Sequence, residues 1–163
     1  MLSAGPRKIA FARELGGWPI CVPKAKRLRG SKAHGVAYEK RVAKEVCRLL
    51  PGTRWGQWYE YGESGRTRFC QVDLVRVSPT SVVVFECKLS NVEEALRQLE
   101  EVYKPVLACA YRLPILGVIV TKSVHRVPEE LTLCASMSDV AQVLRADGEK
   151  VPVLHWLGVG RMA

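Results

Sequence analysis

The sequence lacks both a long apolar run and a pair of closely spaced cysteines. Its longest apolar stretch, Leu113–Val120, contains Pro114 and falls far short of the roughly 20 residues that a membrane-spanning helix requires. The six cysteines are 17 to 26 residues apart, so no CxxC pair begins a zinc site. We therefore expect no membrane span and no structural zinc. Most of the cysteines have apolar neighbours, which favours buried free thiols over disulfides.

Acidic residues are scarce relative to basic ones. The chain of 163 residues has 25 Lys and Arg against 16 Asp and Glu, which gives a net charge of +9. Hydrophobic residues make up 48% of the chain, which excludes wholesale disorder and suits about one globular domain. Charged residues begin at Arg7 and Lys8, where a secretory signal would need an apolar core, so we expect a cytoplasmic protein.

The excess of basic charge is concentrated near the N-terminus. Residues 1–34 carry eight basic side chains and one acidic side chain, whereas the remaining 129 residues carry 17 basic and 15 acidic ones. Three prolines and four glycines in this segment disfavour a packed element. We expect residues 1–33 to form a basic arm ahead of one domain over residues 34–163. A solvated tail would have the same composition as an arm that binds a polyanion. The candidate DNA contacts are Lys24, Lys26, Arg27, Arg29 and Lys32.

Helix and strand patterns alternate over the rest of the chain. A helical period extends over residues 31–50 and ends at Pro51-Gly52. Three strand patterns follow in succession and predict an antiparallel meander over residues 54–61, 68–77 and 82–89. The expected order is completed by a helix over 92–104, a strand over 115–121, a helix over 138–145 and a strand over 151–157. The expected fold class is α/β, with a mixed central sheet flanked by helices.

Glu39 interrupts the apolar face of the first expected helix. At about 100° per residue, its side chain lies among those of Val36, Ala43 and Val46. An isolated carboxylate is costly in apolar surroundings, so a partner must accept its charge. A buried ion pair with Arg or Lys and a functional role both fit this position.

Two carboxylates and an amine meet on the hairpin of the second and third expected strands. A turn centred between Pro79 and Thr80 pairs residues whose numbers sum to 159, which places Asp73 opposite Glu86. Opposed side chains have Cβ atoms about 4.5–5.5 Å apart, and alternation brings Lys88 to the same face. Like charges this close require a protonated carboxyl, compensation by Lys88, or a bound cation. An all-oxygen site of this kind suits Mg²⁺ or Mn²⁺.

The spacing of Asp73, Glu86 and Lys88, with twelve residues and then one residue between them, resembles the active-site motif of the PD-(D/E)XK nuclease superfamily. The resemblance covers residues 34–121. Within the superfamily the chain is most similar to small Holliday junction resolvases, because a Gly-x-x-x-Glu helix start ends at Glu39 and a Val-Asp-Leu-Val strand contains Asp73. Valine replaces the name-giving proline before Asp73. A Gln-x-x-x-Tyr motif of one branch is not met, because five positions separate Gln98 from the next tyrosine.

The resemblance implies a restriction-endonuclease-like core and hydrolysis of DNA that depends on Mg²⁺ or Mn²⁺. In that scheme Asp73 and Glu86 hold the cation, and Glu39 helps bind a second metal or a water molecule. Lys88 orients the attacking water or helps to deprotonate it. Gln98 holds the lysine or a phosphate oxygen.

Several other functions fit the same residues. The enzyme could act on branched DNA as a junction resolvase, or on linear or foreign DNA as a phage or mobile-element nuclease. The chain could also be a catalytically silent DNA-binding module with this fold, or a basic scaffold protein without a DNA role. A homodimer would suit the symmetric cutting of two strands.

The aromatic segment over residues 54–61 offers a further alternative. Trp55, Trp58, Tyr59 and Tyr61 could stack on unpaired bases of a nucleic acid. Aromatic residues on strands mostly contribute to the core, however, and we expect these four side chains to pack.

Overall fold

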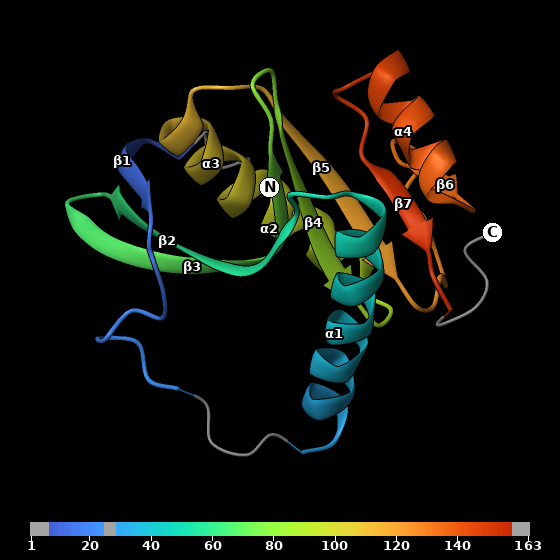
Figure 1. Ribbon diagram of the computed structural model, residues 1–163, viewed down its shortest axis with the longest axis horizontal. Coiled ribbons are helices and arrows are strands. Elements are labelled where there is room, and N and C mark those ends of the chain that lie inside the picture. Colours follow the sequence, from blue (N-terminus) through green and yellow to red (C-terminus); the bar gives the residue numbers. More distant parts are fainter. Residues whose placement is uncertain (1–6, 25–28, 158–163) are drawn as a thin grey trace.

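The computed structural model describes residues 7–24 and 29–157. In this part of the chain seven strands form one mixed sheet, and helices cover both of its faces (Figure 1). The expected α/β class is therefore confirmed. The strands are β1 (Ile9–Glu14), β2 (Arg54–Glu63), β3 (Arg66–Val77), β4 (Val82–Lys88), β5 (Ile115–Thr121), β6 (Thr132–Cys134) and β7 (Pro152–His155). The helices are α1 (Ser31–Leu49), α2 (Val92–Gln98), the π-helix η1 (Leu99–Tyr103), α3 (Lys104–Tyr111) and α4 (Met137–Ala146).

The strand order in the sheet is β1-β2-β3-β4-β5-β7-β6. Neighbouring strands from β1 to β4 are antiparallel, which confirms the expected meander. Neighbours from β4 onward are parallel, because helices cross over between β4 and β5 and between β6 and β7. Within the described residues, no helix has the length and apolar character needed to cross a membrane.

Two apolar cores lie on opposite faces of the sheet. The α2–η1–α3 segment packs on one face, where Leu99 and Leu107 are fully buried. Helices α1 and α4 pack on the other face, where Tyr38, Val42 and Val140 are buried. The central strands are therefore covered on both sides.

All six cysteines are free thiols, as expected. Cys87 and Cys134 are buried, whereas Cys21 is exposed. The other three, Cys47, Cys70 and Cys109, are only partly buried. The prediction of burial therefore holds fully for two thiols and is wrong for Cys21, which lies in the segment between β1 and α1. Apolar neighbours in the sequence indicate burial only where the segment itself packs against a core.

The expectation of an arm without a packed element is wrong for Ile9–Glu14. This segment is edge strand β1, and Ile9 and Ala12 pack against the core on the α3 side. An ion pair between Arg54 and Glu14 also ties β1 to β2. An edge strand buries little of its surface, so its short and charged pattern resembles that of a solvated tail. Strand β6 was also not predicted, because three residues carry no readable period.

The helix that begins at Val92 does not end before Pro105. Helix α2 passes into η1 and then into α3, which continues to Tyr111, so the predicted end near Lys104 is wrong. A proline inside a regular α-helix clashes with the carbonyl four residues earlier. Here Pro105 occupies the first turn of α3, directly after the wider π turns, and this geometry accommodates the ring.

A glycine in β2 changes the alternation of side chains beside Asp73. Gly56 has a φ of +67°, and the flanking pairs of β2 and β3 place it opposite Asp73. Val72 and Val75 both pack in the core on the α3 side, whereas Leu74 packs on the α1 side. A regular strand would put residues 72 and 74 on the same face. The irregularity at Gly56 therefore changes which side chains of the paired strands β2 and β3 face each core.

Replacing Gly56 by Ala is expected to lower the melting temperature by about 2–8 °C, equivalent to roughly 1–2 kcal/mol. A side chain is strained at this positive φ, and its Cβ would lie 3.0 Å from Gln71 Nε2. Thermal unfolding followed by circular dichroism measures the change. Gly17→Ala is the matched control, because a Cβ at Gly17 meets no atom within 4 Å of the described chain. Equal melting temperatures for the two variants would contradict the strain at Gly56.

Candidate active site

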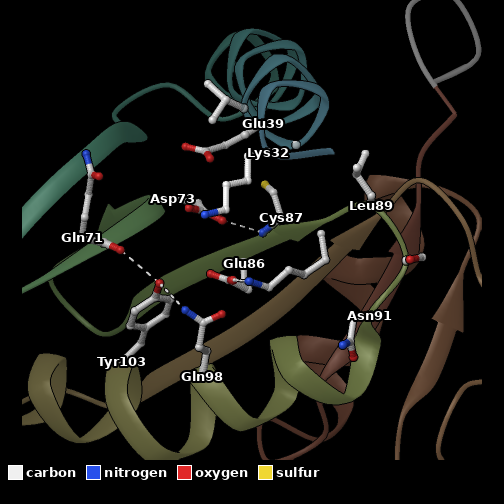
Figure 2. A pocket seen from close by; sticks show the side chains of 14 residues that line it. Lys32, Glu39, Gln71, Asp73, Glu86, Cys87, Leu89, Asn91, Gln98 and Tyr103 are labelled. Carbon is white, nitrogen blue, oxygen red and sulfur yellow. Dashed lines mark hydrogen bonds and ion pairs between the residues drawn. The ribbon is translucent and has the colours of Figure 1, made fainter. Parts of the chain in front are cut away.

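A pocket of about 560 Å³ lies between α1, the middle of β3, the end of β4 and the α2–η1 segment. Figure 2 shows the side chains that surround it. All five side chains that the sequence predicts as catalytic line this pocket: Glu39 from α1, Asp73 from β3, Glu86 and Lys88 from β4, and Gln98 from α2. The fold therefore brings together residues that are as far apart in the chain as Glu39 and Gln98.

The register of β3 and β4 follows the sequence prediction. The paired residues, which end with Leu74 and Phe85, have numbers that sum to 159. The next opposed positions in this register are Asp73 and Glu86. The backbone N–H of Cys87 donates a hydrogen bond of 2.7 Å to Asp73 Oδ2, which fixes the Asp73 carboxyl between the two strands.

Lys88 compensates one of the two carboxylates. Its Nζ lies 2.9 Å from Glu86 Oε1, and Glu86 is only 2% exposed. The other oxygen, Glu86 Oε2, is buried and has no hydrogen-bond partner among the described residues. Buried polar atoms normally have a partner. Burial raises the pKa of Glu86, and hydrogen bonding from the neighbouring Asp73 carboxyl and Tyr103 hydroxyl opposes this rise, so Asp73, Tyr103 or a bound cation can supply the missing partner.

Burial and mutual repulsion raise the pKa values of the two carboxyls. Burial is the main cause that holds the pKa of Asp73 well above its usual range, and the negative charges of Glu86 and Glu39 add to the effect. Burial also raises the pKa of Glu86, although Lys88 opposes this shift. The pocket therefore contains more acidic groups than its own cations neutralise, and a bound cation would favour their ionised forms.

Glu39 is held in the pocket by a tryptophan. The indole Nε1 of Trp55 donates a hydrogen bond of 2.9 Å to Glu39 Oε1. This neutral donor satisfies one oxygen without cancelling the charge, which is why Glu39 still raises the pKa of Asp73. The sequence predicts a partner for Glu39, and the partner is an N–H donor on β2.

The π-helix brings Gln98 and Tyr103 into contact. Gln98 Nε2 lies 3.5 Å from the Tyr103 hydroxyl, which in turn donates a hydrogen bond of 3.0 Å to the Gln71 carbonyl. A π turn places residues five apart one above the other, so the spacing of five positions is compatible with this contact. Gln98 Oε1 is buried and has no hydrogen-bond partner within residues 7–24 and 29–157. Gln98 is therefore half-buried and not a simple surface glutamine.

The predicted DNA contacts occupy different positions. Lys32 is exposed on the first turn of α1 and lines the pocket. Lys24 is exposed, with its Nζ 5.8 Å from the centre of the Trp18 ring, and Arg29 is exposed beside α1. The remaining two candidates, Lys26 and Arg27, lie outside the described residues.

Sequence reasoning missed the contributions of Trp55 and Tyr103. Tyr59 and Tyr61 are buried, as expected, but Trp55 is 48% exposed, so the prediction of packing is wrong for that residue. The glycine that follows Trp55 was the available signal, because glycine inside a strand pattern often marks an irregularity. Tyr103 is buried in the core on the α3 side, and the π turn brings its hydroxyl into contact with Gln98 and the Gln71 carbonyl.

The residues present fit a divalent cation in part. Two oxygen-bearing side chains, Asp73 and Glu86, converge, and one buried oxygen is unsatisfied, which suits a hard cation such as Mg²⁺ or Mn²⁺. In the described part of the chain, no three His, Cys, Asp or Glu side chains form a metal-binding group. Glu39 therefore stays a predicted ligand that contacts Trp55 in this structure.

Comparisons with known proteins give little further information. No family model matches the chain, and no curated protein matches it. Among solved structures, the chain is similar to protein VC1899 from Vibrio cholerae, with 13% sequence identity and a TM-score of 0.39. The similarity covers 72% of this chain and 28% of that protein. The function must therefore be argued from the site residues.

Proposed function

We propose that this protein is a divalent-metal-dependent endonuclease of the PD-(D/E)XK type that hydrolyses DNA. The observation that carries the proposal is the pair formed by the half-buried Asp73 and the buried Glu86, with an unsatisfied oxygen on Glu86 and the Lys88 amine 2.9 Å from its other oxygen. The order of α1, the β2–β4 meander, α2 and the parallel strand β5 supports a restriction-endonuclease-like core.

Each pocket residue has a defined chemical role in this proposal. A divalent cation held by Asp73 and Glu86 would polarise the scissile phosphate and lower the pKa of the attacking water. Lys88 is paired with Glu86 yet 28% exposed, so its amine can stabilise negative charge that develops on a phosphate in the pocket. Glu39, which Trp55 holds in place, would orient the water from the α1 side.

The amide of Gln98 can serve both roles that the resemblance implies. Its Oε1 has no hydrogen-bond partner among the described residues and can accept a hydrogen bond from the Lys88 ammonium. Its Nε2 donates one long hydrogen bond to Tyr103, and its second N–H can donate to a phosphate oxygen.

DNA is the proposed substrate because the chain is basic and Lys32 is exposed at the pocket. Lysines that contact the phosphate backbone give binding that is independent of sequence and weakened by salt. Among DNA substrates we propose a branched one, such as a junction, because the motifs around Glu39 and Asp73 resemble those of small Holliday junction resolvases.

A second candidate is a DNA-binding module without catalysis. This alternative is favoured by the hydrogen bond that engages Glu39 Oε1 with Trp55. It differs from the nuclease in one respect, since it would bind DNA and form no product with any metal.

A cleavage assay on a panel of substrates tests the proposed function. Supercoiled plasmid, linear duplex, single-stranded, flap and four-way DNA are incubated with the full chain in Mg²⁺, Mn²⁺ or EDTA. We expect cleavage with either metal, most rapidly on branched DNA, and none in EDTA. Asp73→Asn, purified by the same route, controls for contaminating nucleases. DNA binding without product from a cooperatively folded protein would support the silent module, and an absence of DNA binding would overturn both candidates.

A further inference from the structure

We propose that the exposed ring of Trp55 is a stacking platform for an unpaired nucleobase next to the scissile phosphate. The proposal deepens the proposed function and rests on it for the location of the phosphate. It assigns the substrate class, namely DNA with unpaired bases at the site of cleavage, such as a single strand, a flap or a frayed branch point.

The position of Trp55 is the first argument for this role. Trp55 pairs with Leu74 on β3, so it lies across from the neighbour of Asp73. Its indole nitrogen contacts Glu39, which lines the same pocket as Asp73. The ring is thus attached to the border of the pocket where the phosphate would bind.

The exposure and orientation of the ring are the second argument. Trp55 is 48% exposed, although tryptophan usually buries most of its large apolar surface. Its hydrogen bond of 2.9 Å to Glu39 fixes the ring edge to α1 and limits rotation of the side chain. A ring whose orientation is already fixed loses little conformational entropy when a base stacks on it.

Other aromatic and basic side chains of the described residues also suit a nucleic-acid strand, and one of them, Trp58, lies on β2 with Trp55. Trp58 forms an aromatic pair with Trp18, with ring centroids 4.8 Å apart, and Trp18 is 40% exposed. Lys24 lies over the Trp18 ring, and Lys32 stands at the pocket. Aromatic rings interspersed with lysines are the combination that single-stranded nucleic acids require, because rings stack on bases and lysines contact phosphates.

Base pairing determines which substrates can use this platform. In an intact duplex each base is stacked between its neighbours, so its face cannot reach a protein ring without unstacking. An unpaired base offers its face at little cost. Stacking on Trp55 would therefore favour DNA whose bases are unpaired beside the cleaved bond.

Equilibrium binding in EDTA tests the platform without any cleavage. The full chain and two variants, Trp55→Phe and Trp55→Leu, are titrated against a fluorescently labelled single-stranded oligonucleotide and against an abasic strand of equal length. Phenylalanine keeps an aromatic face but lacks the N–H that binds Glu39, whereas leucine lacks both. Phe11→Leu, which removes an exposed ring from edge strand β1, is the matched control.

We expect Trp55→Leu to weaken binding of the normal strand about 5- to 100-fold, and Trp55→Phe and Phe11→Leu to weaken it by less than about threefold. The abasic strand should bind all four proteins with similar affinity. Equal losses for Trp55→Phe and Trp55→Leu would show that Trp55 merely holds Glu39 and would overturn the proposal. An unchanged affinity of Trp55→Leu for the normal strand would also overturn the proposal. Equal affinities of the intact protein for the normal and abasic strands would overturn it as well.

Strand binding tests the Trp55 platform, and cleavage tests the proposed nuclease function, so the two can fail independently. Base-dependent binding through Trp55, with no cleavage in Mg²⁺ or Mn²⁺, would leave the platform in a DNA-binding module. Metal-dependent cleavage without any effect of Trp55→Leu on strand binding would leave the nuclease and remove the platform. Melting curves of each variant show whether a loss of affinity comes from unfolding.

Discussion

Replacing Asp73 by Asn is expected to abolish cleavage and, in the metal-free protein, to increase stability. Asp73 is one of two proposed cation ligands, so its loss should reduce the cleavage rate by roughly 1000-fold or more. The same change removes a half-buried carboxyl whose pKa is raised by burial and by the charge of Glu86. At pH 8 in EDTA we expect the melting temperature to rise by about 2–8 °C, equivalent to roughly 1–2 kcal/mol.

The pH dependence of this stability difference follows from the pKa of Asp73. Burial, together with the charges of Glu86 and Glu39, raises that pKa in the folded state, whereas the unfolded carboxyl titrates near about 4. Above pH 4 the folded protein binds more protons than the unfolded chain, so its stability falls as the pH rises through the raised pKa. The gain from Asp73→Asn should therefore be small near pH 4 and largest in alkaline solution.

Melting curves between pH 4 and pH 9 in EDTA measure this difference. Glu129→Gln, which removes an exposed carboxyl that does not line the pocket, is the matched control and should melt like the unaltered protein. Addition of Mn²⁺ should stabilise the unaltered protein more than Asp73→Asn, because a ligand that binds the folded state raises its melting temperature. A destabilised Asp73→Asn at pH 8 would contradict the proposed excess of acidic groups in the pocket.

The hairpin that carries the acidic residues could be predicted from the sequence because local rules determine it. A tight turn at Pro79 and Thr80 sets the register, and alternation then places Asp73, Glu86 and Lys88 together. The paired positions of β3 and β4 confirm this register. The apolar period of α1 likewise placed Glu39 toward the sheet, where it lines the pocket.

Features that depend on tertiary contacts could not be predicted in the same way. The position of β1 depends on its pairing with β2, from Glu14 with Tyr59 to Ile9 with Glu63, and nothing local in Ile9–Glu14 requires this long-range pairing. The continuation of the helix past Pro105 depends on the π turns before it. The exposure of Trp55 depends on Gly56, whose positive φ interrupts the alternation that otherwise predicts packing.

In the candidate site, too, some positions follow from local rules and others depend on tertiary contacts. Its acidic groups and Lys88 belong to strand positions that obey a period of two, so the sequence places them together. The hydrogen-bond partners of Glu39 and Gln98 come from other elements of the fold. Trp55 donates to Glu39, and Tyr103 contacts Gln98. A side-chain hydrogen bond between distant elements has no period, and only the assembled structure reveals it.

Replacing Lys88 by Met is expected to lower both activity and stability, in contrast to the change at Asp73. Lys88 Nζ is 2.9 Å from a carboxylate that is only 2% exposed. Removal of one partner leaves Glu86 with a buried and uncompensated charge, which costs about 2–4 kcal/mol at pH 8, or about 4–16 °C in melting temperature. The cleavage rate should fall by about 100-fold or more, because the amine no longer faces the phosphate.

A double variant separates the two effects of Lys88. Glu86→Gln combined with Lys88→Met removes the buried charge together with its partner, so it should recover most of the melting temperature but none of the activity. The deficit of Lys88→Met alone should also shrink as the pH falls, because burial raises the pKa of Glu86 and a protonated carboxyl needs no cation. Lys122→Met, which removes an exposed amine just after β5, is the control and should change neither quantity. If the double variant melted as low as Lys88→Met, the loss would come from side-chain packing of Lys88, and the charge balance proposed for the pocket would be wrong.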